Sequence, residues 1–112
     1  MEIIEIESEE QLKKVLFTKP YKLCVIDCYA VWCGPCKTLG ASLKEYVNKN
    51  ASNLENVIIC KLDVDNEDFS EFVSMNKIKS LPTVLFVKGD DVLESVIGNN
   101  FSEIVKNINE LK

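Results

Sequence analysis

The stretch Trp32-Cys33-Gly34-Pro35-Cys36-Lys37 decides the fold and the chemistry of this chain. The residues before it, Leu23 to Tyr29, are apolar except for Asp27, and such a run predicts a fully buried central strand. A helix is expected to start near Gly34-Pro35, because proline is tolerated in the first turn of a helix. Both cysteines are therefore predicted to lie where a buried strand gives way to a helix N-terminus.

A helix N-terminus favours a thiolate, because it carries a partial positive charge and unpaired N–H groups. The two-residue spacing lets the second sulfur fold back onto the first within one helical turn. We therefore expect Cys33 to attack a substrate disulfide and Cys36 to resolve the intermediate, with Gly34 and Pro35 shaping the turn. Cys33 precedes the helix and is expected to be exposed, whereas Cys36 lies in the first turn and is expected to be shielded.

A Cys-X-X-Cys pair is also half of a zinc site, which needs two further ligands. The sequence contains no second such pair and no histidine, so no metal site is expected. An accidental pair of cysteines is the other alternative. The position of the pair between a strand and a helix favours a redox motif over both.

The composition excludes several classes of function. The net charge is −5, with thirteen lysines, no arginine and no histidine, which disfavours binding to nucleic acids or to an anionic membrane surface. Without histidine the chain has no Cys–His or Ser–His catalytic pair. Its N-terminus is acidic and resembles no leader peptide, and five cysteines fit a reducing compartment, so we expect a cytoplasmic protein.

Hydrophobic periodicity predicts one α/β domain over residues 1–112. Strands are predicted at 3–6, 23–29, 56–62, 83–87 and 92–97. Helices are predicted after the capping-box pattern at Ser8, from Gly34 towards Asn50, around Phe69 to Val73, and after Asn100. The order β-α-β-α-β-α-β-β-α implies parallel pairing of strands that a helix separates, and one antiparallel hairpin at Gly89-Asp90. We expect a mixed central sheet with helices on both faces.

Asp27 is a carboxylate in an otherwise apolar strand, where burial without a partner raises a carboxyl pKa. Two interpretations remain open: a hydrogen-bonded core aspartate, or a general base that takes the proton of Cys36 directly or through water. Lys61 lies on the neighbouring predicted strand. It is expected either to reach Asp27 and tune it, or to extend to solvent.

The sequence resembles the thioredoxin family over essentially its whole length. The resemblance rests on segments in the family's order and spacing: Trp32-Cys33-Gly34-Pro35-Cys36, Val25-Ile26-Asp27, Ala30-Val31-Trp32, Lys61-Leu62-Asp63-Val64-Asp65, Leu81-Pro82-Thr83 and Gly98. It implies the thioredoxin fold, a monomer without a bound prosthetic group, and reduction of protein disulfides. It also implies Asp27 as the base, recycling by a thioredoxin reductase that uses NADPH, and clients such as peroxiredoxin and ribonucleotide reductase.

The resemblance also implies a cis peptide bond before Pro82, where the sequence alone equally allows a trans bond. Leu81 would then keep its main chain free for an extended substrate. An apolar collar around Cys33 is expected to bind such a segment. Its members are Trp32, Pro35, Leu81, Ile97 and Gly98.

The chain departs from the family at a few positions. Gly40 and Ala41 stand where many members have a helix-kinking proline, and Tyr29 stands where a second tryptophan is frequent. Cys24, Cys28 and Cys60 are additional. Cys24 and Cys28 alternate with Asp27 and are expected to pack on the opposite face of the sheet, with redox regulation or a second disulfide as the alternatives.

The Gly-Pro dipeptide between the cysteines favours a reductase. Family members specialised as oxidants or isomerases usually carry a histidine there. The alternative to an enzyme is a binding protein: a thioredoxin-like subunit that serves a partner through its surface.

Overall fold

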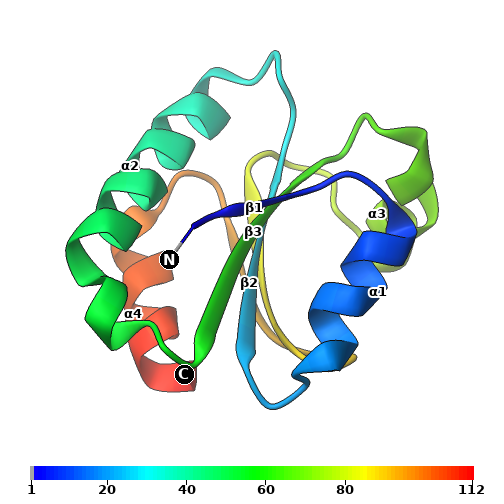
Figure 1. Cartoon of the computed structure of the whole chain (residues 1–112). Coiled ribbons are helices and arrows are strands. Elements are labelled where there is room, and N and C mark those ends of the chain that lie inside the picture. Colours follow the sequence, from blue (N-terminus) through cyan, green and yellow to red (C-terminus); the bar gives the residue numbers. More distant parts are fainter. Residues whose placement is uncertain (1) are drawn as a thin grey trace.

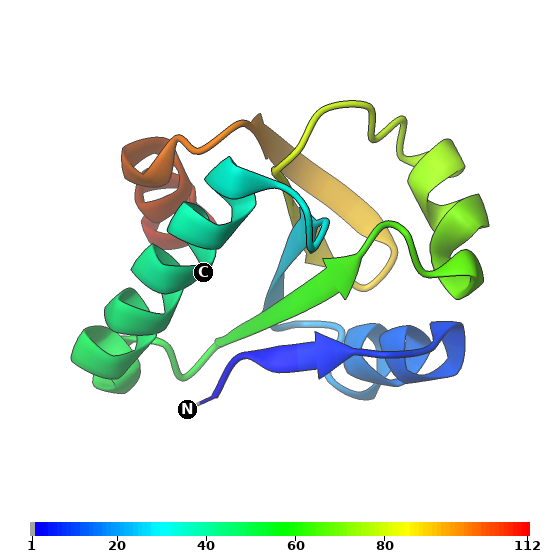
Figure 2. The same cartoon turned by 90° about the horizontal axis from the view of Figure 1, so that it is seen from above.

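The computed structural model describes residues 2–112, which form a five-stranded sheet with helices on both faces (Figure 1). The strands are β1 (Ile4–Ile6), β2 (Leu23–Tyr29), β3 (Val57–Asp63), β4 (Thr83–Lys88) and β5 (Asp91–Ile97). The helices are α1 (Glu9–Thr18), α2 (Gly34–Asn50), α3 (Ser70–Met75) and α4 (Phe101–Leu111), with short 3₁₀ turns η1 (Ala51–Asn53) and η2 (Glu67–Phe69). Apart from these two turns, the order of elements is the predicted one. Seen from above, α2 and α4 lie on one side of the sheet, and α1 and α3 on the other (Figure 2).

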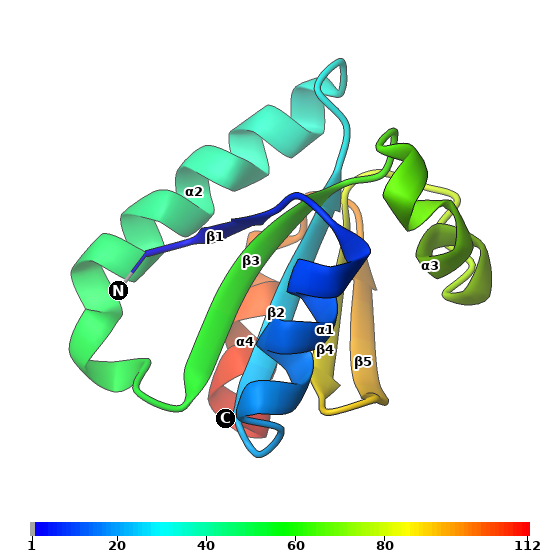
Figure 3. The same ribbon diagram turned by 45° about the vertical axis from the view of Figure 1, so that its right-hand side comes forward.

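The strands stand in the order β1-β3-β2-β4-β5. The first three run parallel, and the predicted β4–β5 hairpin is antiparallel. However, β4 is also antiparallel to β2, which corrects the expectation that all strands separated by a helix pair in parallel. Helix α3 does not carry the chain back to the start of β3, because Thr83 at the beginning of β4 pairs with Cys28, and the β3 partner of Cys28 is Leu62, near the end of that strand. The chain therefore enters β4 from the end at which β3 finishes, beside α3 (Figure 3).

Alternation along β2 separates two apolar cores. Leu23 and Val25 pack with α2 and α4, while Ile26 and Cys28 pack with α1 and α3. Asp27 has the parity of Leu23 and Val25, so it lies on the face that α2 covers. The sheet thus places the buried carboxylate of Asp27 on the same side as the helix that starts at the cysteine pair.

Local signals set the helix ends. The Ser8 hydroxyl accepts a hydrogen bond from the Gln11 amide at 3.1 Å, as its capping position predicts. Helix α1 ends before Pro20, and α2 runs unbroken through Gly40. None of the helices within residues 2–112 is both long and apolar enough to span a membrane.

Candidate active site

Cys33 is the N-cap of α2, and Cys36 lies in the first turn of this helix. The two residues form a disulfide, with their Cα atoms 5.3 Å apart. The backbone N–H of Cys36 donates a hydrogen bond to the Sγ of Cys33 at 3.2 Å. The helix therefore directs one of its otherwise unpaired N–H groups at the sulfur assigned as the nucleophile, an arrangement that stabilises negative charge there.

The expected exposure of Cys33 is wrong for the disulfide form. Cys33 is only 5% exposed and Cys36 is 2% exposed, so both are buried. They form a small cluster with Ala30, against which Tyr29, Val64 and Leu81 pack. Bonding of the two sulfurs and packing of these apolar side chains leave little of Cys33 open. The predicted shielding of Cys36 is confirmed.

Cys33 nevertheless borders a hollow of about 460 Å³, which we call the Cys33 hollow. Its lining residues are Trp32, Cys33, Gly34, Pro35, Val64, Ile78, Lys79 and Leu81. Four of the predicted site residues besides Cys33 thus meet here, whereas Val64, Ile78 and Lys79 were not predicted. No local pattern marks them, because two come from the loop between α3 and β4, whose path depends on the tertiary fold.

Trp32 is a strongly exposed part of this site, at 71%. Its indole Nε1–H donates a hydrogen bond to Oδ2 of Asp65 at 2.8 Å, which holds the ring beside the hollow. In the sequence Asp65 stands out only as part of a family-like segment, and its role as an anchor is visible only in the structure. A large apolar ring held in place beside a reactive sulfur offers a surface for an apolar peptide segment.

The peptide bond between Leu81 and Pro82 is cis, as the family resemblance implied. The N–H of Gly98 donates to the carbonyl of Pro82 at 2.8 Å, and Ile97 pairs with Thr83 across the β4–β5 ladder. Ile97 is 67% exposed and, like Gly98, does not line the Cys33 hollow. The predicted collar therefore consists of two parts: the hollow itself, and a separate Ile97-Gly98 edge tied to Pro82.

Asp27 is completely buried, with an exposure of 0%. Neither carboxylate oxygen has a hydrogen-bond partner among residues 2–112, so no protein group supports the interpretation as a hydrogen-bonded core aspartate. Burial raises the pKa of Asp27 from 3.8 to about 6; the positive charge of Lys61 opposes this rise, and the negative charge of Glu5 adds to it. A carboxylate with such a pKa exchanges protons near neutral pH, as a general base requires.

Lys61 lies directly beside Asp27 in the register of β2 and β3. Its ammonium does not form an ion pair with Asp27 in the part of the chain described here; it lies 4.3 Å from the centre of the Tyr29 ring. The lysine is half-buried and does not simply extend to solvent. Lys61 therefore acts on Asp27 through space rather than by a hydrogen bond.

The three additional cysteines are buried in the core that faces α1 and α3; this is the face predicted for Cys24 and Cys28, opposite Asp27, and Cys60 lies on it too. The sulfurs of Cys24 and Cys60 are 3.7 Å apart and share a hydrogen bond. Burial raises the pKa of the Cys28 thiol, and the hydrogen bond with Cys24, together with burial, raises that of Cys60. Packing, the first interpretation, fits these positions. No cluster of three metal-ligating side chains occurs in residues 2–112.

Comparison with known proteins gives a consistent result. A sequence model of the family described as Thioredoxin matches residues 3–110. Thioredoxin-T of Drosophila melanogaster is 35% identical over 105 residues, which cover 93% of this chain and 63% of that protein. Thioredoxin of Oryctolagus cuniculus is 32% identical over 107 residues, which cover 96% of each chain.

Solved structures agree with the sequence comparison. Malassezia sympodialis thioredoxin has a TM-score of 0.84 and 30% identity, with 98% of this chain and 90% of that chain covered. The reduced Schistosoma mansoni thioredoxin pre-protein has a TM-score of 0.86 and 29% identity, with both chains fully covered. The similarity thus extends over the whole fold and is not confined to the cysteine motif.

Proposed function

Because this chain belongs to the thioredoxin family of thiol-disulfide oxidoreductases, we propose that it reduces disulfide bonds of client proteins through Cys33 and Cys36. The observation that carries this proposal is the placement of the Cys33 sulfur at the N-terminus of α2, within hydrogen-bond distance of the Cys36 amide. That placement stabilises the thiolate, which is the reactive form in disulfide exchange.

The reaction proceeds in two exchanges. The Cys33 thiolate attacks one sulfur of the client disulfide and displaces the other sulfur as a thiolate, which leaves a mixed disulfide. Cys36 then loses its proton and attacks the sulfur of Cys33. This second step releases the other client thiolate and forms the Cys33–Cys36 disulfide. Two electrons pass to the client, and the protein is oxidised to the form described above.

Asp27 is the proposed acceptor of the Cys36 proton. It lies on the face of the sheet covered by α2, and its raised pKa of about 6 makes the carboxylate basic enough to accept a proton near pH 7. Lys61 tunes this base by charge alone. Cys36 and Lys61 line the same small hollow of about 190 Å³ beside Tyr29, and we propose that water carries the proton from this hollow to the buried Asp27 behind it.

The Cys33 hollow and the Ile97-Gly98 edge form the proposed client-binding surface. Trp32, Pro35 and Leu81 supply apolar contact beside the reactive sulfur, and Pro82 shapes the turn that presents Leu81. An extended, apolar segment on either side of a client disulfide fits this surface best.

Recycling of the oxidised form is assigned to a cytoplasmic thioredoxin reductase that draws electrons from NADPH, with the chain acting as a monomer. One similar structure, at 25% identity and a TM-score of 0.79, concerns the thiol resolving mechanism in yeast mitochondrial 1-Cys peroxiredoxin via glutathione/thioredoxin systems. We propose that peroxiredoxins and ribonucleotide reductase are among the clients of this chain.

The test is reduction of insulin disulfides, coupled to NADPH oxidation by a thioredoxin reductase. We expect turnover by the wild-type protein and none by Cys33→Ser. A wild-type protein that folds but neither accepts electrons from the reductase nor reduces insulin with dithiothreitol as donor contradicts the proposal, and points to a binding subunit. The midpoint potential of the Cys33/Cys36 pair distinguishes a reductase from an oxidase, because an oxidase has the higher potential.

A further inference from the structure

Three charged residues, one of which is the proposed base Asp27, form a row across the sheet. The strand register places Glu5 of β1 opposite Lys61 of β3, and Lys61 opposite Asp27 of β2. The cation of Lys61 therefore has a carboxylate on each side. It forms an ion pair with neither within residues 2–112, so something other than a direct salt bridge holds it.

Tyr29 contacts two members of this row. The ammonium of Lys61 lies 4.3 Å from the centre of the Tyr29 ring, a distance at which a cation is attracted to the ring face. The Tyr29 hydroxyl donates a hydrogen bond to Oε2 of Glu5 at 2.9 Å. The ring thus holds the cation, while the hydroxyl occupies the carboxylate that would otherwise attract the lysine away from Asp27.

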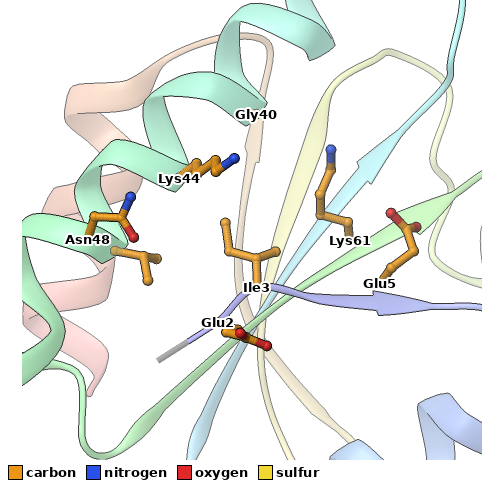
Figure 4. Close-up of a pocket in the computed structure, with 8 residues that line it drawn as sticks. Glu2, Ile3, Glu5, Gly40, Lys44, Asn48 and Lys61 are labelled. Atoms are coloured by element: carbon orange, nitrogen blue, oxygen red, sulfur yellow. The ribbon is translucent and has the colours of Figure 1, made fainter.

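Gly40 provides the space on the other side. A Cβ at this position of α2 would lie 3.3 Å from the Nζ of Lys61, closer than ordinary contact. Gly40 and Lys61 both line a hollow of about 440 Å³, where Lys44 and Glu5 also lie (Figure 4). Lys61 also borders the smaller hollow beside Cys36. The ammonium therefore has room to move in two directions, and its position depends on the groups that hold it.

We propose that Tyr29 and Gly40 are positioning residues that hold the ammonium of Lys61 between Glu5 and Asp27, and thereby control proton transfer from Cys36 to Asp27. This inference rests on the proposed role of Asp27 as the base. The titratable and charged groups that face the row come from β1, β2, β3 and α2, and β4 contributes the apolar Val84. They are Glu2 (just before β1), Glu5, Asp27, Tyr29, Lys61, Asp63, Cys36, Lys37 and Lys44.

The test follows the Asp27 carboxyl by ¹³C NMR during a pH titration of the reduced protein. Lys61→Met removes the positive charge and should raise the titration midpoint of Asp27 by about 1 pH unit. Tyr29→Leu should raise the midpoint in the same direction, because the ammonium is released towards Glu5. Tyr29→Phe is the matched comparison: it loses the hydroxyl that occupies Glu5 but keeps the ring face that holds the ammonium, so it should raise the midpoint by clearly less than Tyr29→Leu does.

The decisive comparison is made in the Lys61→Met background. If Tyr29 acts through Lys61, Tyr29→Leu should shift the midpoint in the wild type and add nothing to Lys61→Met. Equal shifts by Tyr29→Leu in both backgrounds, or equal shifts by Tyr29→Leu and Tyr29→Phe, overturn the proposal for Tyr29. The result is independent of turnover, so a failure of insulin reduction by the wild-type protein would count against the proposed function and not against this inference.

Gly40→Ala supplies a second test in case Tyr29→Leu does not fold. The added methyl group should displace the ammonium and change the midpoint of Asp27 in the wild type but not in Lys61→Met. Thr38→Ala, an exposed change in the same helix, is its control and should leave the midpoint unchanged. An unchanged midpoint in Gly40→Ala, or a change that persists in Lys61→Met, overturns the proposal for Gly40.

Discussion

The backbone amide of Cys36 points at the sulfur of Cys33, with 3.2 Å between the nitrogen and Sγ. Both sulfurs therefore lie at the start of α2, but the N–H group of its first turn is directed at the sulfur of Cys33. This asymmetry assigns the attack on the client to Cys33 and the release of the client to Cys36.

The first prediction tests this assignment. Cys36→Ser keeps the nucleophile and removes the resolving thiol, so it should accumulate a mixed disulfide with the client through Cys33. Cys33→Ser is the control and should trap nothing. Non-reducing electrophoresis followed by peptide mapping identifies the bond. Trapping that requires Cys36 instead would reverse the two roles.

A second prediction concerns stability and pH. The pKa of Asp27 is raised from 3.8 to about 6 in the folded protein, so the unfolded chain loses this proton first as the pH rises. Wild-type stability should therefore fall between about pH 4 and pH 6, by about 3 kcal/mol in total. Below this pH range the carboxyl is neutral in both the folded and the unfolded protein, so its ionisation does not lower the free energy of unfolding.

Asp27→Asn removes the buried charge, so its gain in free energy of unfolding over the wild type should be small at pH 4 and about 3 kcal/mol larger at pH 8. Urea unfolding at the two pH values measures this difference. Asp90→Asn, in the exposed turn before β5, is the control and should show no such dependence. A gain for Asp27→Asn that is the same at both pH values would show that burial does not raise the pKa of this carboxyl.

A third prediction ranks the thiols of the reduced protein by alkylation. Iodoacetamide at about pH 6 should label Cys33 almost alone, because only Cys33 combines a stabilised thiolate with a position beside an open hollow. Cys24, Cys28 and Cys60 are buried on the other face of the sheet. Mass-spectrometric peptide mapping measures how much of each cysteine is labelled. Labelling of Cys60 or Cys28 at a rate similar to Cys33 would require a second redox centre in place of packing.

A fourth prediction concerns the contact between Trp32 and Asp65. Trp32 is the only tryptophan of the sequence, so intrinsic fluorescence reports on it alone. Asp65→Ala removes the 2.8 Å hydrogen bond to the indole and should lower the fluorescence anisotropy. It should also raise the KM for insulin with little change in kcat, since the ring contacts the client and not the reacting atoms. Glu67→Ala, an exposed change in the same loop, should alter neither quantity.

Local chemistry made most of the fold predictable. The apolar run of β2 was predicted with its observed ends, Leu23 and Tyr29, and Gly34-Pro35 correctly marked the start of α2. β3 was predicted one residue too early, because Asn56 and Asp63 at its two ends are both polar and alternation does not separate them. The direction of β4 was predicted wrongly, since pairing direction depends on how far α3 carries the chain and not on any residue pattern.

The site was predictable in its chemistry but not in its contacts. The spacing of the two cysteines identifies Cys33 and Cys36. The polarity of Asp27 within an otherwise apolar strand identifies the carboxylate. The burial of Cys33 and the position of the Lys61 ammonium over Tyr29 arise from packing between separate elements, which no local sequence pattern encodes. The same holds for Ile78 and Lys79 at the hollow.

The insertion of β3 between β1 and β2 has a consequence for synthesis on the ribosome. Residues 4–6 and 23–29 emerge early, yet in the finished sheet they do not touch as neighbours, because both pair with residues 57–63. The nascent chain therefore carries Cys24, Cys28, Cys33 and Cys36 without a completed parallel sheet until Asp63 has left the exit tunnel. Only then does the sheet divide the thiols between its two faces, so protection against mispairing begins only after β3 has emerged.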